Sequence, residues 1–450
     1  MHPADLPIPE TAAALRRGGL SCRDLIEAHL ERIAARDPDL GAFVALDAEG
    51  ARNAADQADL ALRRGEDAGP LHGIPFGVKD LIDVEGADTR CGSRLFADRI
   101  ADRDAPVVAR LRKAGAIPIG QLASYEFALT GPSHDAAYPP AKNPCSHDHI
   151  TGGSSSGSAA AVAAGLVRMA IGTDTGGSVR SPAAYCGLVG LKPTFGLVPT
   201  EGVFPLSPSL DHVGPMTASV TEAALMLDAM APTAGACAAL GAGIQGLRIG
   251  YARDWFAHDP EATPDLTRAM DDAVSDLSLL GARIDLITMQ DYDIAEAAGA
   301  VILHAEALAQ HQQGLRQSPD LYGRQARQSL MGGVGLSAED VARARAVGIR
   351  IRAETELLFQ DHDVIVTPTT LAPAPPVAAL QGDETVWTAM RTLPFNLTGH
   401  PAMSLPIGFS GGLPLGMQIL ARHHAEAMIC RVGAAFEAAT DHSARSPYLV

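Results

Sequence analysis

Two turns rich in glycine and serine, one on either side of a short apolar run, restrict the fold of this chain more than any other feature. The first turn, TGGSSSGS, begins at residue 151 and precedes small residues that predict a helix over 159–166. The run VRMAIGTD then predicts a strand, and TGGS predicts a sharp turn. The next stretch, SPAAYCGLVGLKPT, predicts a helix and another strand. Along the segment 151–196, one polar turn therefore precedes a single predicted strand and another polar turn follows it.

Helical and strand patterns alternate before this segment. Residues 10–65 have helical periodicity, with Ser21 as a helix N-cap and Asp37-Pro38 as a stop, and we expect residues 1–65 to form an N-terminal helical arm. The stretch GIPFGVKDLID predicts a strand that ends near Lys79 and Asp80. A helix and a strand follow in the βαβ rhythm of a buried sheet, at 106–114 and 116–121.

The second half of the chain predicts a helical region followed by more strands. Residues 236–360 are mostly helical and contain no motif, so we treat them as a variable region. Strands are predicted at 247–251, 283–287, 363–367, 401–406 and 413–420, and a last helix at 425–438. Large α/β enzymes reach 450 residues as one unit, so we predict a single domain over 1–450.

Charge and hydropathy exclude several classes of partner. The chain has 35 basic and 52 acidic residues, a formal charge of −17, which would repel a phosphate backbone. Aromatic residues make up only 4%, so few side chains could stack on bases. The longest apolar run, 159–167, is about half of a membrane span, and the N-terminus lacks the pattern of a signal peptide. We therefore expect a cytoplasmic protein that binds neither nucleic acid nor a membrane.

Cysteine and histidine spacing gives no sign of a metal or a cofactor. No two of the six cysteines are close enough for a CxxC motif. The HExxH motif is absent, and the neighbouring His423 and His424 match no known ligand spacing. We therefore expect neither a metal nor an organic cofactor, and no disulfide framework.

Lysine is rare, which shortens the list of candidate bases. Only four of the 35 basic residues are lysines: Lys79, Lys113, Lys142 and Lys192. A buried lysine can lose its proton, whereas arginine stays charged. Lys79, at the end of a predicted apolar strand, is therefore a candidate general base, although a surface position is the ordinary fate of a lysine.

The first turn has two interpretations that use it alone. A glycine-rich loop before a helix can hold phosphate, but neither GxxxxGK[ST] nor GxGxxG is present. Residues 153–157 also spell GxSxG, the nucleophile elbow of α/β-hydrolases, and Asp211, His212 and His400 follow as possible partners. The elbow requires a strand leading into the serine, and CSHDHITG before it is polar and turn-like. Its serines could also simply cap the following helix.

A third interpretation uses both turns. A serine nucleophile needs a base to take its proton and donors that stabilise the oxyanion. In Thr175-Gly176-Gly177-Ser178 the glycines allow successive amide N–H groups to point into one concavity beside the Ser178 hydroxyl. The loop could therefore supply both a nucleophile and an oxyanion hole.

With both turns considered together, the chain resembles the amidase signature family, the Ser-cisSer-Lys hydrolases. The matching stretches are GIPFGVKD around Lys79, GGSSSGSAAAVAAG from Gly152, GTDTGGSVRSPAAYCGLVGLKPTFG from Gly172, and LDHVGP. Weaker similarity continues through VIVTPT and PFNLTGHPAMSLPIG. The resemblance implies an α/β/α sandwich around a large twisted mixed β-sheet, with no cofactor and no metal. A homodimer is a further expectation from the resemblance alone.

The resemblance also implies roles for individual residues. Ser178 would attack a carbonyl carbon and form an acyl-enzyme, Ser154 would follow a cis peptide bond and relay the proton, and Lys79 would be the base. The backbone amides of Thr175, Gly176, Gly177 and Ser178 would form the oxyanion hole. The implied activity is cleavage of the C–N bond of a small carboxamide or carbamate. Penicillin-recognising Ser-Lys enzymes match less well, because no lysine here has a serine three residues before it.

Two other interpretations stay open. The family includes the glutaminase subunit of tRNA-dependent amidotransferases, which usually carries arginine after the glycine of LKPTxGR, whereas Leu197 follows Gly196 here. This difference favours a free-standing amidase. A non-catalytic binding protein on the same fold is the alternative of another class. Arg180 is expected to make structural hydrogen bonds, and Asp211 and His212 are expected to be structural too.

Overall fold

One mixed β-sheet of eleven strands runs through the molecule. The computed structural model describes residues 2–129, 131–133, 136–380 and 387–442. The strand order in the sheet is β1-β3-β2-β4-β6-β5-β10-β11-β9-β7-β8. Parallel pairs (β2 with β3 and β4, β7 with β8 and β9) flank an antiparallel centre. The strands are β1 Phe43–Leu46, β2 Pro75–Lys79, β3 Ile117–Leu122, β4 Met169–Asp174, β5 Val189–Lys192, β6 His212–Thr217, β7 Arg248–Tyr251, β8 Arg283–Leu286, β9 Val364–Pro368, β10 Ala402–Ser410 and β11 Leu413–Leu420.

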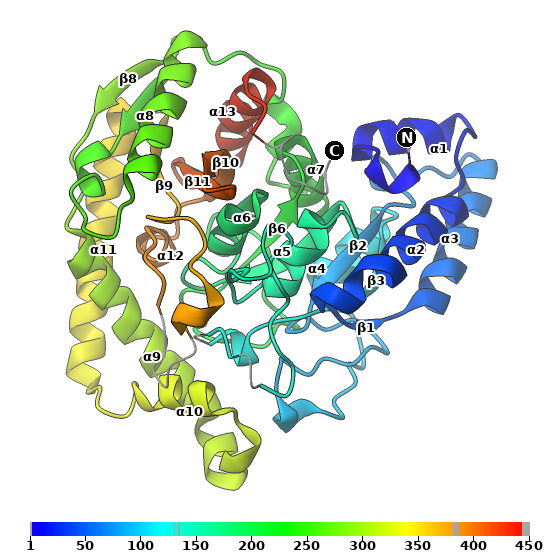
Figure 1. The fold of residues 1–450 in the computed structure, drawn as a ribbon, viewed down its shortest axis with the longest axis horizontal. Coiled ribbons are helices and arrows are strands. Elements are labelled where there is room, and N and C mark those ends of the chain that lie inside the picture. The colour runs from blue at the N-terminus through cyan, green and yellow to red at the C-terminus, as the bar shows by residue number, and fades with distance from the viewer. Residues whose placement is uncertain (1, 130, 134–135, 381–386, 443–450) are drawn as a thin grey trace.

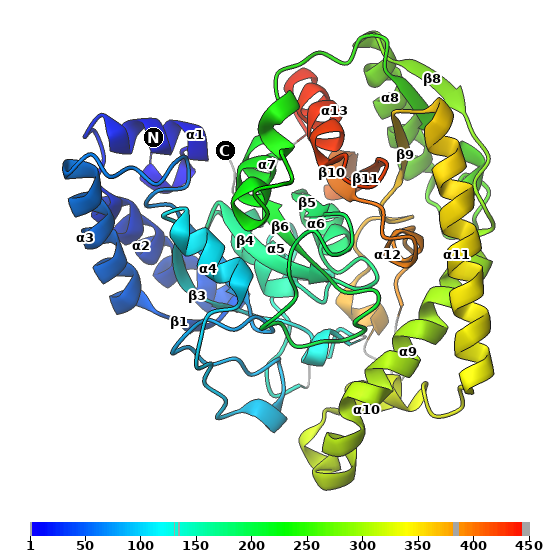
Figure 2. The same ribbon diagram turned by 180° about the vertical axis from the view of Figure 1, so that it is seen from behind.

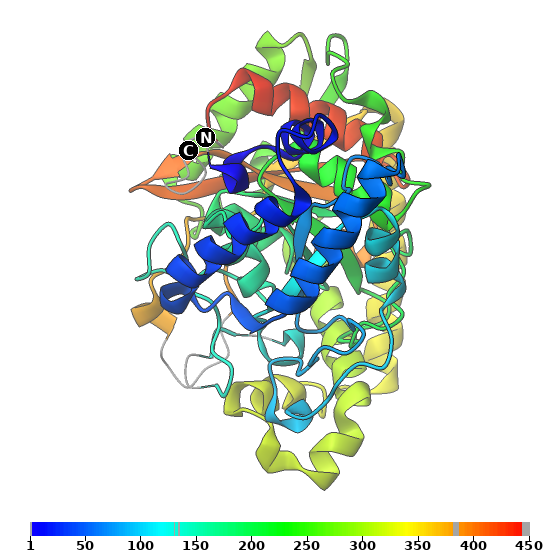
Figure 3. The same ribbon diagram turned by 90° about the vertical axis from the view of Figure 1, so that its right-hand side faces the viewer.

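Helices cover both faces of the sheet. Helices α5 and α6 pack on the face toward the viewer in Figure 1, and α4 and α7 on the face seen in Figure 2. In the side view of Figure 3, the red α13 lies on one side of the orange strands β10 and β11. The helices are α1 Ile8–Arg16, α2 Cys22–Leu40, α3 Ala48–Arg63, α4 Pro106–Lys113, α5 Ser156–Ala163, α6 Arg180–Cys186, α7 Val220–Met230, α8 Pro264–Leu279, α9 Tyr292–Gln317, α10 Arg324–Met331, α11 Ala338–Asp361, α12 Pro394–Leu397 and α13 Glu426–Ala439. This is the expected α/β/α architecture around a mixed sheet.

Different groups of helices lie beside the two edges of the sheet. Helices α1 to α3 gather beside β1 and β3, and α9 to α11 lie beyond the other end (Figure 1). In the part of the chain that the structure describes, no helix combines the length and the apolar character needed to cross a membrane.

Three elements differ from those expected from the sequence: helix α2 and strands β1 and β6. Helix α2 does not stop at Asp37-Pro38 but continues to Leu40, with Pro38 in its last turn. The Asp37 carboxylate accepts hydrogen bonds from the Ala42 and Phe43 amides, which holds the end of the helix although Pro38 has no N–H. The short edge strand β1 and the strand β6 were also not predicted, because β1 is short and β6 contains proline.

The strand order places Lys79 close to the start of the second turn. Strands β2 and β4 are parallel neighbours, so Lys79 and Asp174, the last residues of these strands, lie at the same edge of the sheet. Helix α5 packs behind them and is buried along its whole length. Gly157 makes this close approach possible, because a Cβ atom there would lie 2.3 Å from the Ala123 amide nitrogen.

Candidate active site

Lys79 lies at the centre of the site and is fully buried. Its side chain is 0% exposed, and its Nζ atom lies 2.7 Å from both Ser154 Oγ and Thr173 Oγ1. Burial lowers the pKa of Lys79 to about 7, although the nearby carboxylates of Asp174 and Asp211 act in the opposite direction. A large fraction of this amine is therefore uncharged near neutral pH.

The first turn presents Ser154 to Lys79. The peptide bond between Gly153 and Ser154 is cis, and the ring of Tyr125 packs against Gly153 so closely that a Cβ atom there would lie 2.4 Å from it. Both Gly153 and Ser154 line a cavity. The turn thus brings the Ser154 hydroxyl between the buried amine and the cavity.

The neighbouring serines do not cap helix α5. Ser155 is the N-cap residue but makes no capping bond with its side chain. Its Oγ instead donates to the Thr173 carbonyl and accepts from the Thr173 amide, at 3.2 and 3.3 Å. Ser155 is also buried, and no strand leads into it, so the nucleophile-elbow interpretation does not fit the structure.

The second turn is held by a buried ion pair. Asp174 and Arg180 are both 0% exposed, and Arg180 contacts the two carboxylate oxygens at 2.9 and 3.0 Å. Asn396 Nδ2 donates to Asp174 Oδ1 at 2.8 Å and to its backbone carbonyl at 2.9 Å. Although burial alone would raise the pKa of Asp174, Arg180 holds it below its usual range. Arg180 therefore has the structural role expected from the sequence.

One of the four expected oxyanion donors has another partner. The Gly177 amide donates to Asp174 Oδ1 at 2.9 Å. Because an amide has a single hydrogen, this donor is taken up inside the loop and does not point to a substrate oxygen. The sequence pattern shows that a loop can bend but not which acceptor each N–H meets, so this contact of Gly177 was not foreseen.

Two important residues were not singled out from the sequence. Thr173 binds the Lys79 amine, and Asp174 organises the second turn. The acidic residue of GTDTGGS, directly before a glycine turn, was the available signal. Asp211 and His212 contact the Thr175 hydroxyl and the Leu210 carbonyl, respectively, as expected of structural residues.

A cavity lies beside the two serines, and the described residues that line it are uncharged. It has a volume of about 580 Å³, and both Ser154 and Ser178 line it. Its walls include Tyr125, Leu303 of α9, Trp387 and Met390. Among the described residues that line it, none carries a charged side chain. The apolar remainder of the wall consists of Ala128, Leu129, Ile150, Leu206 and Leu303.

Comparison with known proteins identifies the class. The family profile named Amidase matches residues 24–430. The A-type subunit of glutamyl-tRNA(Gln) amidotransferase from Roseiflexus sp. (strain RS-1) is 37% identical, over 99% of this chain and 98% of that protein. The fold and these matches define an amidase-type hydrolase. The chain belongs to the amidase signature family, which confirms the resemblance seen in its motifs.

Two solved structures extend the comparison. One comes from a study of an unexpected vestigial protein complex that reveals the evolutionary origins of an s-triazine catabolic enzyme; it has a TM-score of 0.89 and 34% identity, and the match covers 96% of this chain and 98% of that one. The A-type subunit of glutamyl-tRNA(Gln) amidotransferase from Thermotoga maritima has a TM-score of 0.78 and 28% identity, with 97% and 95% covered. Taken together, the names of the relatives favour the amidotransferase alternative over the free-standing amidase that we expected.

The ion pair behind the second turn leads to a stability prediction. We expect Asp174→Asn to lower the free energy of unfolding by about 3–5 kcal/mol, because it leaves the buried Arg180 guanidinium without a compensating charge. Chemical denaturation monitored by circular dichroism measures this loss. Glu339→Gln is the control, since its ion pair with Arg343 is exposed and should contribute little. A loss below about 1 kcal/mol for Asp174→Asn would contradict the assigned role.

Proposed function

We propose that Ser178 attacks the carbonyl carbon of a carboxamide and that the chain hydrolyses its C–N bond through an acyl-enzyme. The neutral amine of Lys79 accepts the Ser154 proton while Ser154 accepts the proton of Ser178. The same path returns a proton to the leaving nitrogen, so that ammonia or an amine departs. Water then attacks the acyl-enzyme, again with Lys79 as the base, and releases the carboxylic acid.

One observation carries this proposal. The Lys79 amine, fully buried and with a lowered pKa, lies 2.7 Å from the Ser154 hydroxyl at the wall of a cavity that Ser178 also lines. Among the described residues, the Nζ atom contacts two hydroxyls and forms no ion pair with a carboxylate. This arrangement suits a base that gains and loses a proton.

The oxyanion is the other charge that must be stabilised. We assign this role to the backbone amides of Thr175, Gly176 and Ser178, which lie in the loop that lines the cavity. Asp174 acts through the loop and not on the substrate, because its carboxylate binds the Gly177 and Val179 amides. It is thus a positioning residue for this function.

Two substrate classes follow from different observations. The relatives named as the A-type subunit of an amidotransferase support a glutaminase subunit that delivers ammonia within a complex. The free-standing amidase is supported by Leu197 after Gly196 and by the described cavity lining, which offers no charged group to the ammonium and carboxylate of glutamine. An uncharged, partly apolar amide fits that lining better.

Ammonia release tests both classes. The purified chain is incubated with glutamine and with uncharged aliphatic and aromatic amides, alone and with the partner subunits of a related amidotransferase. Glutamine cleavage that requires the partners supports the glutaminase subunit. Cleavage of uncharged amides by the chain alone supports the amidase. If a correctly folded chain cleaves no amide under either condition, the proposed function is wrong.

A further inference from the structure

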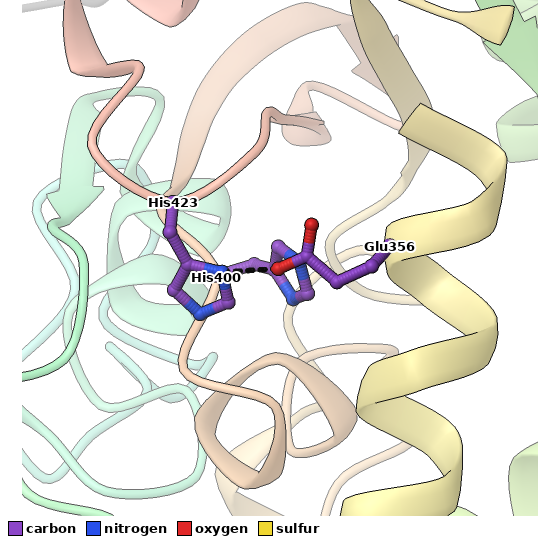
Figure 4. A group of neighbouring side chains, drawn as sticks. All are labelled: Glu356, His400 and His423. Carbon is purple, nitrogen blue, oxygen red and sulfur yellow. Dashed lines mark hydrogen bonds and ion pairs between the residues drawn. The ribbon is translucent and has the colours of Figure 1, made fainter. Parts of the chain in front are cut away.

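Three side chains from distant segments meet near the end of helix α12, which carries Asn396. Glu356 lies on α11, His400 directly precedes β10, and His423 follows β11. Figure 4 shows the Glu356 carboxylate reaching from its helix toward both imidazole rings. One potential ligand atom from each residue lies within 4.8 Å of the other two. None of the three residues lines the cavity beside Ser178.

His423 places its Nδ1 atom against the Glu356 carboxylate. Its Nε2 atom lies 3.1 Å from the Thr398 carbonyl, which can only accept, so the hydrogen of the neutral ring sits on Nε2. Its Nδ1 atom then carries a lone pair and lies 2.6 Å from Glu356 Oε1. Two acceptors at this distance need a cation or an extra proton between them.

His400 supplies a second nitrogen to the same point. Its side chain is 0% exposed, and its Nδ1 atom lies 2.9 Å from the Thr398 hydroxyl. Its Nε2 atom is 3.2 Å from Glu356 Oε1 but makes no hydrogen bond in the described structure. A buried ring nitrogen without a hydrogen bond is costly unless something else binds it.

We propose that Glu356 Oε1, His400 Nε2 and His423 Nδ1 form a binding site for a divalent transition-metal ion, with Zn²⁺ as the favoured ion. Two imidazoles and one carboxylate are a donor set that zinc accepts, with a fourth position left for water. A tetrahedral ion with bonds of ~2.1 Å needs ligand atoms ~3.4 Å apart. The His400 Nε2 and Glu356 Oε1 atoms, 3.2 Å apart, are close to this value, whereas the 2.6 Å between His423 Nδ1 and Glu356 Oε1 must increase by about 0.8 Å. Glu356 is 42% exposed, which leaves the ion a route of entry.

The surroundings of the site resemble those of metal ligands. Ligating histidines usually make a hydrogen bond through their other ring nitrogen, and Thr398 meets both rings in this way, through its carbonyl and its hydroxyl. The site thereby revises our expectation of no metal. No sequence motif signalled it, because the three ligands are not locally spaced.

The ion would link α11 to the segment behind the second turn. Thr398 and His400 directly follow α12, and Asn396 of this helix binds Asp174. A metal at this point would tie these elements together without touching the cavity. Its role is therefore structural, independent of the reaction proposed for Ser178.

Zinc titration of the purified full chain tests the site. After treatment with a chelator, binding of Zn²⁺ is measured by competition with a chromophoric chelator, and Co²⁺ provides a spectrum that separates nitrogen and oxygen ligands from thiolates. This matters because all six cysteines are free. The variants are Glu356→Gln and His423→Gln, both at partly exposed positions, with the exposed His258→Gln as a matched control.

We expect one Zn²⁺ per chain, a fall in affinity of at least about tenfold in Glu356→Gln and in His423→Gln, and no change in His258→Gln. Zinc should raise the melting temperature of the wild type and of the control but not of the two site variants. Equal zinc affinity in all four proteins, thiolate ligation of Co²⁺, or no binding would overturn the proposal.

Discussion

Replacing Ser178 by alanine is expected to lower kcat/KM by about 10⁴-fold or more, on whichever amide the wild type cleaves. The variant lacks the attacking oxygen, and the lysine and Ser154 have no other nucleophile to activate at this position. Its fold should be intact, because Ser178 is half-buried in a loop that the Asp174 carboxylate holds through neighbouring amides. The measurement is the release of ammonia under substrate-limited conditions.

A second readout separates the chemistry from a loss of structure. With a slowly hydrolysed amide or ester, mass spectrometry should detect a covalent acyl adduct in the wild type and none in Ser178→Ala. Ser275→Ala is the control, since its exposed hydroxyl only binds the Asp271 carbonyl on α8. If the Ser178 variant retains more than about a tenth of the wild-type rate, another residue is the nucleophile.

Replacing Lys79 by arginine is expected to lower kcat/KM by about 10³-fold or more, although the positive charge is kept. The guanidinium does not lose its proton near neutral pH, so it cannot accept one from Ser154. It is also larger than the amine, in a place where the lysine is 0% exposed. Lys113→Arg is the matched control, because Lys113 is exposed at the end of α4 and its rate should stay unchanged.

The pH profile of the wild type tests Lys79 as the general base without substituting any side chain. The active form is the neutral amine, and its fraction grows as the pH rises through the pKa of Lys79, about 7. The kcat/KM of the wild type should therefore increase with pH up to about 8 and then level off. A profile that is flat between about pH 5.5 and about pH 8.5 would contradict a lysine base of this pKa.

Local sequence patterns predicted part of the fold. The strand at 413–420 has the predicted bounds, and the strand that ends at Lys79 was expected, because apolar runs bounded by turn residues fit a buried strand. The prediction that helix α2 ends at Pro38 was wrong, because the Asp37 carboxylate holds its last turn through the Ala42 and Phe43 amides, and the Asp-Pro pair alone does not reveal these local bonds. Strand β6 had no clear pattern, because pairing on both sides compensates for its glycine and proline.

In the candidate site, too, local motifs were predictable from the sequence and long-range contacts were not. The motifs around Lys79, Ser154 and Ser178 were recognisable because each needs particular residue types at close spacing. Other contacts could not be recognised from the sequence. The partner of Gly177 depends on how a loop turns, and the partners of Asp174 and Glu356 include residues from distant parts of the chain.

The amino-acid sequence by itself determined the family, the order of most elements and the candidate chemical groups, which are a lysine at the end of a strand and two turns that contain serine. Only the tertiary structure decided which acceptor the Gly177 amide meets, that the described cavity wall is uncharged, and that two histidines and a glutamate lie close together. The reason is physical: hydrophobic patterning and turn propensity act between near neighbours, whereas desolvation and hydrogen-bond partners depend on every segment that packs around a group.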